Sequence, residues 1–336
     1  MNQLNETSGP SHKTRVARTA LAERSLSIDR FRGVLVIMMV IGDYLSGIQW
    51  VPAFLKHAPD VGFTIADTVA PAFVFVIGLN YGTSFNRRFA HDPVAAYRHF
   101  IVRYLSLVGI GAIISIGSLV VGDTPGWGVL LSLGVAGLIN LIFIRIPTWG
   151  RLVIGTIMLI GYQILLDASM LQSVLEGSHG GPFGAISWAA LLVLSTAVAD
   201  IWRKDQKQYL VAISTLTVAA IVSSVVVPVS KHRVSLSFVL LTLAISAAAL
   251  LISELISQNY PDKRGFLCWW GENALALYIL HLLILAVVVL PPIDWWYVNV
   301  PWSVALAQLV AILTFMTLLA IWMKRWRQNA RSRKSR

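Results

Sequence analysis

Four side chains that can carry a proton lie in or beside the most apolar segments of this sequence. They are Asp43, His57, Asp67 and His281. A charged side chain inside a bilayer costs at least ~2.5 kcal/mol on insertion scales, so such residues usually face the interior of a helix bundle and serve a function. Carboxylates and imidazoles are also the groups that general acid–base catalysis uses most often. We therefore treat these four residues as candidates for a functional site.

Their spacing places all four groups at a similar depth. Asp43 follows Arg32 by eleven residues, a helical rise of about 16 Å, which is near the middle of a first membrane span. Asp67 lies shortly after the start of a second span, His57 lies in the connection between these two spans, and His281 lies in the outer half of a later span. Because a carboxylate beside an imidazole makes it a better base, His57 is the predicted base, with Asp43 or Asp67 as its partner.

The same residue types allow other interpretations. An aspartate inside a span can be a structural partner for another helix, and a single histidine can simply fill space in the packing. Intramembrane Asp and His residues are also typical of a proton relay, so a proton-coupled small-molecule transporter is the main alternative function. A structural membrane component with buried polar contacts is a third. The sequence shows no internal repeat clear enough to support a transporter built from inverted repeats.

A second polar group lies at the opposite end of the first span. Residues 25–33 carry alternating charges, including Asp29 and Arg32, directly before the apolar run begins. Glu272 and Asn273 enter a later span from the same side, so we expect them to meet this strip. Alone, the strip could equally be a basic flank that anchors the first helix in the membrane.

Composition indicates the elements that must position these groups. The chain has 336 residues, of which 56% are hydrophobic and 13% charged, and its mean hydropathy is +0.70. Apolar windows of about 20 residues are long enough to cross a bilayer. They predict an all-α bundle of about ten transmembrane helices with no sizeable soluble domain. The expected spans are 33–50, 61–82, 99–121, 126–144, 150–168, 184–202, 209–228, 234–256, 266–291 and 302–323.

The basic residues predict the orientation of this bundle. With the N-terminus inside, 24 of the 27 Lys and Arg residues fall on the cytoplasmic side, and only Lys56, Lys231 and Arg233 fall outside. This asymmetry predicts that both termini are cytoplasmic. It also explains the net charge of +11 without a nucleic-acid partner. We expect a disordered tail over residues 1–23, a membrane domain over 24–323, and a basic tail over 324–336 that faces anionic lipid headgroups.

Two kinds of feature are not found in the sequence. Cys268 is the only cysteine, which excludes an intramolecular disulfide and a multi-cysteine metal site, and we predict no metal. The first apolar run is too long for a cleavable signal peptide, so we expect it to remain as the first helix.

Three segments resemble a known family. SIDRFRGVLVIMMVIGDY and KHAPDVGFTIADTVAPAFVFVIG resemble the start of the heparan-α-glucosaminide N-acetyltransferase-like transmembrane acyltransferases. The match consists of an acidic-x-x-Arg-Gly strip, a Lys-His pair in the first outer loop, and a Thr-hydrophobic-Ala-Asp turn before a proline-containing helix. GENALALYILHLLI resembles the family's late helix, which contains an asparagine and ends in a histidine. LEGSHGGPFGAISWAALLVLSTAVAD is a weaker match to a Gly-rich loop and helix of bacterial relatives.

The resemblance implies a membrane-embedded acyltransferase that transfers an acetyl or other short acyl group. The donor would be cytosolic acetyl-CoA or another acyl-CoA, the acceptor an extracytoplasmic amino sugar or glycan, and the location a bacterial inner membrane. The catalytic role carries over to His57, and Asp29, Arg32, Asn273 and His281 become candidate substrate-binding residues. Transfer through an acyl-histidine and direct transfer both remain open.

One position departs from the family pattern. Family members carry asparagine eleven residues after the arginine of the strip, and the more distant acyltransferase family 3 usually carries a catalytic histidine there. This chain carries Asp43. The position is therefore predicted to be functional, whereas the acceptor is left open among amino sugars, sugar hydroxyls and cell-envelope polymers. Arg87 and Arg88 could hold CoA phosphates, or could simply be cytoplasmic charges that orient the helices.

Overall fold

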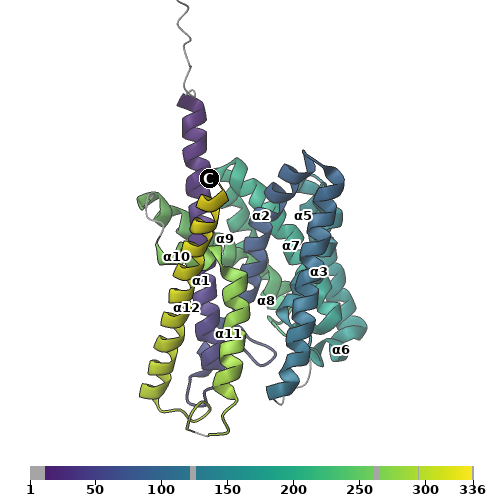
Figure 1. The fold of residues 1–336 in the computed structure, drawn as a ribbon. Coiled ribbons are helices and arrows are strands. Elements are labelled where there is room, and N and C mark those ends of the chain that lie inside the picture. Colours follow the sequence, from purple (N-terminus) through teal and green to yellow (C-terminus); the bar gives the residue numbers. More distant parts are fainter. Residues whose placement is uncertain (1–11, 122–125, 261–264, 294, 335–336) are drawn as a thin grey trace, which may run out of the picture.

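The fold is all-helical, as the composition predicts (Figure 1). The computed structural model describes residues 12–121, 126–260, 265–293 and 295–334, and no strand occurs among them. The α-helices are α1 (His12–Ser46), α2 (Val69–Phe89), α3 (Pro93–Gly117), α4 (Val129–Phe143), α5 (Thr148–Leu165), α6 (Leu171–Leu175), α7 (Gly181–Lys204), α8 (Gln206–Val226), α9 (Leu236–Asn259), α10 (Phe266–Glu272), α11 (Ala274–Val289) and α12 (Trp302–Lys334). Short 3₁₀ turns include η2 (Ala66–Thr68) and η5 (Ser178–Gly180).

The described helices include fewer candidate membrane spans than the ten expected from the sequence. Among the described residues, seven helices are long and apolar enough to cross a bilayer, and the pair α10–α11 makes eight if it counts as one span. Helix α4 is apolar but has only 15 residues. The first expected span, 33–50, falls mostly within α1, which begins at His12 inside the segment expected to be a tail. The chain is thus an integral membrane protein, and ten crossings stay a prediction.

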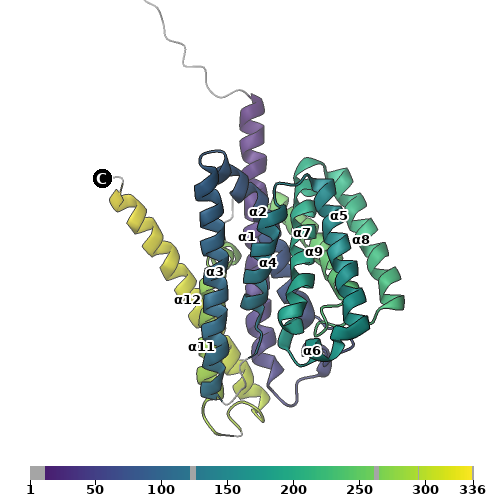
Figure 2. The same ribbon diagram turned by 90° about the vertical axis from the view of Figure 1, so that its right-hand side faces the viewer.

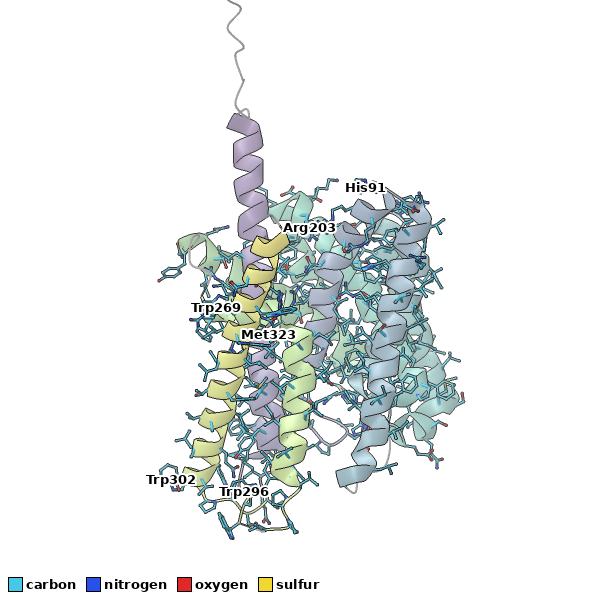
Figure 3. The ribbon with its side chains drawn as sticks, in the orientation of Figure 1. His91, Arg203, Trp269, Trp296, Trp302 and Met323 are labelled. Atoms are coloured by element: carbon cyan, nitrogen blue, oxygen red, sulfur yellow. The ribbon has the colours of Figure 1, made fainter. Side chains whose placement is uncertain are left out.

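Both ends of the described chain lie at the same end of the bundle. Helix α1 begins and α12 ends there (Figure 1), and His91 and Arg203 lie at this end too (Figure 3). Trp296 and Trp302 lie at the opposite end (Figure 3), as expected for aromatic residues at a membrane interface. The end that carries the basic segments is the one that the charge asymmetry predicts to be cytoplasmic. Lys263 and Arg264, which were counted on that side, lie outside the described residues.

Helix α7 forms the centre of the bundle. It contacts α2, α4, α5, α8 and α9, and the small side chains of Ala185, Ala189 and Ala190 are all buried in it. A helix that is apolar on every face is stable only when neighbours surround it. Figure 2 shows α12 at one side of the bundle and α8 at the other, with α1, α2 and α4 between them.

The expected ninth span is broken, which corrects the prediction of one continuous helix over 266–291. Helices α10 and α11 meet at 87°. Asn273 lies at the break, where its side-chain Nδ2 donates to the Trp269 carbonyl at 2.7 Å. This bond satisfies a carbonyl at the end of α10 and stabilises the break.

Helix α10 packs against the start of α1, as the two polar segments predict. A β-carbon added at Gly271 would lie inside the contact distance of the Asp29 carbonyl oxygen, and one at Gly33 would clash with the backbone of Leu267. Only glycine allows two backbones to approach this closely. The resulting contact fixes Asp29 and Arg32 relative to the helix break.

Candidate active site

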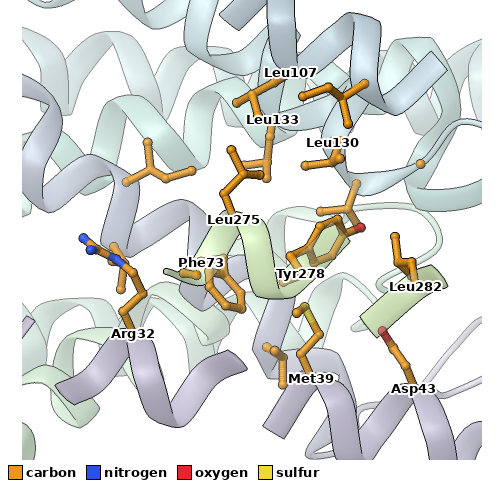
Figure 4. Close-up of a pocket in the computed structure, with 18 of the residues that line it drawn as sticks. Arg32, Met39, Asp43, Phe73, Leu107, Leu130, Leu133, Leu275, Tyr278 and Leu282 are labelled. Atoms are coloured by element: carbon orange, nitrogen blue, oxygen red, sulfur yellow. The ribbon is translucent and has the colours of Figure 1, made fainter. Parts of the chain in front are cut away.

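One large cavity lies between α1, α2, α3, α4 and α11. Its volume is about 910 Å³, within the usual range of ligand sites. Its walls are mainly apolar, and Figure 4 shows Met39, Phe73, Leu107, Leu133 and Leu275 lining it. Polar side chains line it at two places: Arg32 and Arg103 at one, and Asp43, His57 and Lys231 at the other. Arg32 and Asp43 lie on the same helix, about 16 Å apart along its axis, so the cavity extends over a large part of the bundle's depth.

His57 and Asp67 form a carboxylate–imidazole pair at the outer end of this cavity. The Nδ1 atom of His57 lies 2.8 Å from Oδ1 of Asp67. The His57 side chain is 37% exposed and lines the cavity, whereas the Asp67 side chain is fully buried behind it. Because the Asp67 carboxylate accepts a hydrogen bond from Nδ1–H, this contact leaves Nε2 of His57 as the proton acceptor.

Asp67 is fixed by the loop that precedes it. Its Oδ2 atom accepts hydrogen bonds from the backbone N–H of Ala58 at 3.2 Å and from the N–H and hydroxyl of Thr64 at 3.1 and 3.0 Å. Three donors on one oxygen favour the ionised carboxylate. The spacing Thr-hydrophobic-Ala-Asp thus folds as a turn that closes on its own aspartate and positions it for His57.

Asp43 and His281 form a second pair in the reverse orientation. Nε2 of His281 lies 2.9 Å from Oδ2 of Asp43, and the side chains are 2% and 31% exposed, respectively. Here the carboxylate lines the cavity, and the imidazole is buried between α11 and α1. The site therefore presents one imidazole backed by a carboxylate and one carboxylate backed by an imidazole.

Arg32 and Arg103 provide the positive charge at the other end. Arg32 donates to the Gly271 carbonyl at 3.3 Å and pairs with Asp29 at 3.4 Å, so α10 and the strip of α1 hold it in place. Arg103 comes from α3 and lines the same cavity. Guanidinium groups are well suited to phosphate oxygens because they donate in a planar fork.

The structure sorts six of the seven predicted site residues into two sets of three. Arg32, Asp43 and His57 line the cavity. Asp29, Asp67 and His281 lie behind these three and contact one each. The seventh, Asn273, is buried and bonds to the backbone of α10, so its position is that of a helix-break residue, and it is not among the described residues that line the cavity.

Besides Arg103, two further residues that line the cavity, Lys231 and His179, were given no site role from the sequence. Lys231 comes from the loop between α8 and α9, and its Nζ lies 3.8 Å from Oδ1 of Asp67. His179 lies in η5 with φ 56° and ψ 31°, a left-handed conformation that is uncommon for a residue other than glycine and often marks a functional site. The sequence held one signal for each residue. Lys231 is one of the three basic residues predicted outside, and His179 lies in the segment that resembles a Gly-rich loop.

The described residues contain no group of three or more His, Cys, Asp and Glu side chains that could hold a metal ion. The arrangement instead provides a proton acceptor, a carboxylate and cations around an apolar cavity. These groups suit a proton-coupled transfer onto or from an organic substrate.

Comparison with known proteins finds similarity to one family. A family model described as heparan-α-glucosaminide N-acetyltransferase, catalytic, matches residues 24–176, the segment that holds Arg32, Asp43, His57, Asp67 and Arg103. Over this segment the chain is similar to that family. Human heparan-α-glucosaminide N-acetyltransferase is 32% identical over 124 residues, and the mouse enzyme of the same name is 39% identical over 61 residues.

The extent of these matches is limited. The human alignment covers 35% of this chain and 18% of the human enzyme, and the mouse alignment covers 18% and 9%. The chain therefore spans less than a fifth of the length of the curated relatives it matches. Helices α7–α12 lie outside the segment that the family model matches. His281 and Lys231 therefore enter the site from a part of the chain that this family model does not cover.

Proposed function

We propose that this protein is a membrane-embedded acyltransferase that moves an acetyl or other short acyl group from cytosolic acyl-CoA to an amino sugar or glycan on the far side of the membrane. The observation that carries the proposal is the single cavity that joins the two-arginine end to the His57–Asp67 pair. An acyl-CoA is bulky and polyanionic, while its acyl group is small. Such a cavity lets the acyl group cross without its carrier.

The donor would enter at the arginine end. Arg32 and Arg103 are placed to contact the phosphates of CoA, and the apolar walls around Phe73 and Leu275 suit its uncharged arm. The thioester would then lie toward Asp43 and His57. Arg88 lines a separate open pocket with Arg98 and His99, so the alternative phosphate site predicted for Arg87 and Arg88 is not part of this cavity.

The acceptor would react at the outer end. Nε2 of His57 removes a proton from the acceptor amine or hydroxyl as the nitrogen or oxygen attacks the thioester carbon, and Asp67 stabilises the imidazolium that forms. The tetrahedral intermediate then collapses, the C–S bond breaks, and the CoA sulfur takes the proton from His57. In this direct transfer His57 acts only as a base and then as an acid, and Asp67 stays behind it as the counter-charge.

Asp43 is proposed to hold the acceptor. A carboxylate at the cavity surface accepts hydrogen bonds from an amine or hydroxyl group, and His281 keeps this carboxylate oriented. Asp43, in place of the family's asparagine, would then strengthen binding of an acceptor that donates hydrogen bonds, such as the neutral amine of an amino sugar.

Replacement of Asp43 tests this role. We expect Asp43→Ala to lower kcat/KM for glucosamine by about 10²-fold, the loss of one or two strong hydrogen bonds, and to leave KM for acetyl-CoA unchanged. Asp43→Asn should retain more activity because its amide oxygen still accepts from His281. Equal losses for donor and acceptor, or unfolding of both variants, would instead indicate a structural ion pair.

The function itself is tested with purified protein in detergent, acetyl-CoA carrying a radiolabelled acetyl group, and glucosamine. Appearance of labelled N-acetylglucosamine together with free CoA supports it, and no acyl transfer to glucosamine or to isolated cell-envelope glycans would overturn it. A mass shift in envelope glycans after deletion of the chain from a bacterial host would identify the acceptor in vivo. The transporter alternative is not favoured, because the matched family is named for an acetyltransferase.

A further inference from the structure

The loop between α8 and α9 is tied to the loop that carries His57. The backbone N–H of Gly62 donates to the Val229 carbonyl at 2.8 Å, and Ser230 Oγ donates to Asp60 at 2.9 Å. Arg233 also donates from Nε to Asp60 at 2.9 Å, and this contact holds the pKa of Asp60 below its ordinary value. The two loops therefore form one unit, in which Arg233 acts as a clamp.

This clamp brings Lys231 beside the catalytic pair. Its Nζ lies 3.8 Å from Oδ1 of Asp67, the same oxygen that His57 contacts at 2.8 Å. The Lys231 side chain is only 13% exposed, and it lines the cavity together with His57. At 3.8 Å Asp67 provides a counter-charge but takes none of the three N–H donors of the ammonium group.

We propose that Lys231 is the oxyanion-binding residue of the acyl transfer. The inference rests on the proposed function and adds a hydrogen-bond donor for the negative charge that develops on the thioester carbonyl oxygen. When the acceptor attacks the thioester, the carbonyl π electrons move onto oxygen, and His57 takes the acceptor's proton. The Lys231 ammonium donates a hydrogen bond to the resulting oxyanion until the C=O bond re-forms and the C–S bond breaks. A hydrogen-bond donor that is already placed at the developing oxyanion, in a cavity sheltered from water, strongly accelerates the chemical step.

The surroundings of Lys231 predict how this role depends on pH. Burial lowers the pKa of Lys231 from its ordinary value, and the negative charges of Asp67 and Asp43 partly oppose this shift. His57 shares the Asp67 oxygen with Lys231, and Lys231, His57 and His232 all lie near enough to His179 to act on it electrostatically. Only the protonated amine donates to an oxyanion, so activity should fall at alkaline pH as Lys231 loses its proton, at a pH below that expected of an exposed lysine.

Three variants separate an oxyanion role from a structural one. Lys231→Met should lower kcat for acetyl transfer from acetyl-CoA to glucosamine by about 10²–10³-fold, the cost of one oxyanion donor, with KM for acetyl-CoA nearly unchanged. Lys231→Arg should keep part of the activity and lose the alkaline fall, because a guanidinium stays charged. Lys56→Met is the control, because it removes the other lysine predicted on the outer side. Among the described residues, the Lys56 ammonium donates only to the Gln49 carbonyl, at 3.4 Å. The kcat of this variant should match that of the wild type.

A binding measurement tests the role without turnover. The trifluoromethyl ketone analogue of acetyl-CoA forms a stable hydrate with an oxygen at the oxyanion position. It should bind the wild-type protein about 10²-fold more tightly than Lys231→Met, while CoA binds both equally. A wild-type level of kcat in Lys231→Met, or a raised KM for glucosamine alone, would overturn the proposal. An inactive wild type that binds neither CoA nor the analogue would overturn the proposed function itself.

Discussion

Replacement of His57 by alanine is expected to reduce acyl transfer by about 10²–10⁴-fold, the usual worth of a positioned general base. His57 is the imidazole that both lines the cavity and has a buried carboxylate behind it, at 2.8 Å. Without Nε2 the acceptor must lose its proton to water, and the tetrahedral intermediate returns to reactants more often. The measurement is kcat for acetyl-CoA and glucosamine with protein purified in detergent.

The control for this variant is a histidine away from the cavity. His91 is exposed at the opposite end of the bundle (Figure 3), and His91→Ala should keep the wild-type rate. Acetyl-CoA should bind His57→Ala with nearly unchanged affinity, since its phosphates are expected at Arg32 and Arg103. Full activity in His57→Ala would contradict the mechanism and leave Asp43 as the proton acceptor to examine next.

Asp67→Asn is expected to cost about 10³–10⁴-fold in kcat, comparable to the loss of the aspartate in a hydrolase triad. The amide nitrogen of asparagine can donate to Nδ1 of His57 and so favours the tautomer that carries its proton on Nε2. That tautomer cannot accept the acceptor's proton. The geometry would be nearly unchanged, so the loss should appear in kcat while acetyl-CoA binding persists.

A rescue variant distinguishes this role from loop folding. Asp67 also accepts hydrogen bonds from Ala58 and Thr64, so its removal could simply disorder the loop. Asp67→Glu restores a carboxylate and should recover activity relative to Asp67→Asn if charge and tautomer matter. If both variants are equally inactive and also lose thermal stability, Asp67 has a structural role, and the base–carboxylate pair is refuted.

The sequence predicted a common depth for the polar groups but only part of their pairing. Helical rise gave the depth of Asp43, and the expected spans gave those of His57, Asp67 and His281. Asp67 was one of two partners predicted for His57. The pairing of Asp43 with His281, 238 residues away, depends on how α11 packs against α1. Side-chain spacing along one chain contains no information on that packing. The local pair was accessible in principle, because only ten residues separate His57 from Asp67, and the turn between them folds on itself.

The break after α10 and the role of Lys231 were beyond sequence reasoning for different reasons. Asn273 lies in an apolar run that reads as one span, and the bend becomes visible only when its amide bonds back to Trp269. Lys231 was noted only as an exception to the charge asymmetry. Its loop folds onto the outer loop of Asp60 through Arg233. Lys231 and Arg233, only two positions apart, therefore have different surroundings: Arg233 binds Asp60, and Lys231 lines the cavity.

The proposed function requires the acyl group to cross the membrane while CoA stays on its own side, and an assay in sealed vesicles measures this separation. The protein is reconstituted with glucosamine only inside the vesicles and radiolabelled acetyl-CoA only outside. We predict labelled N-acetylglucosamine inside, an equal amount of free CoA outside, and neither product with His57→Ala. If label reaches glucosamine only when donor and acceptor share one compartment, the cavity does not join the two sides of the membrane, and the proposed function is contradicted.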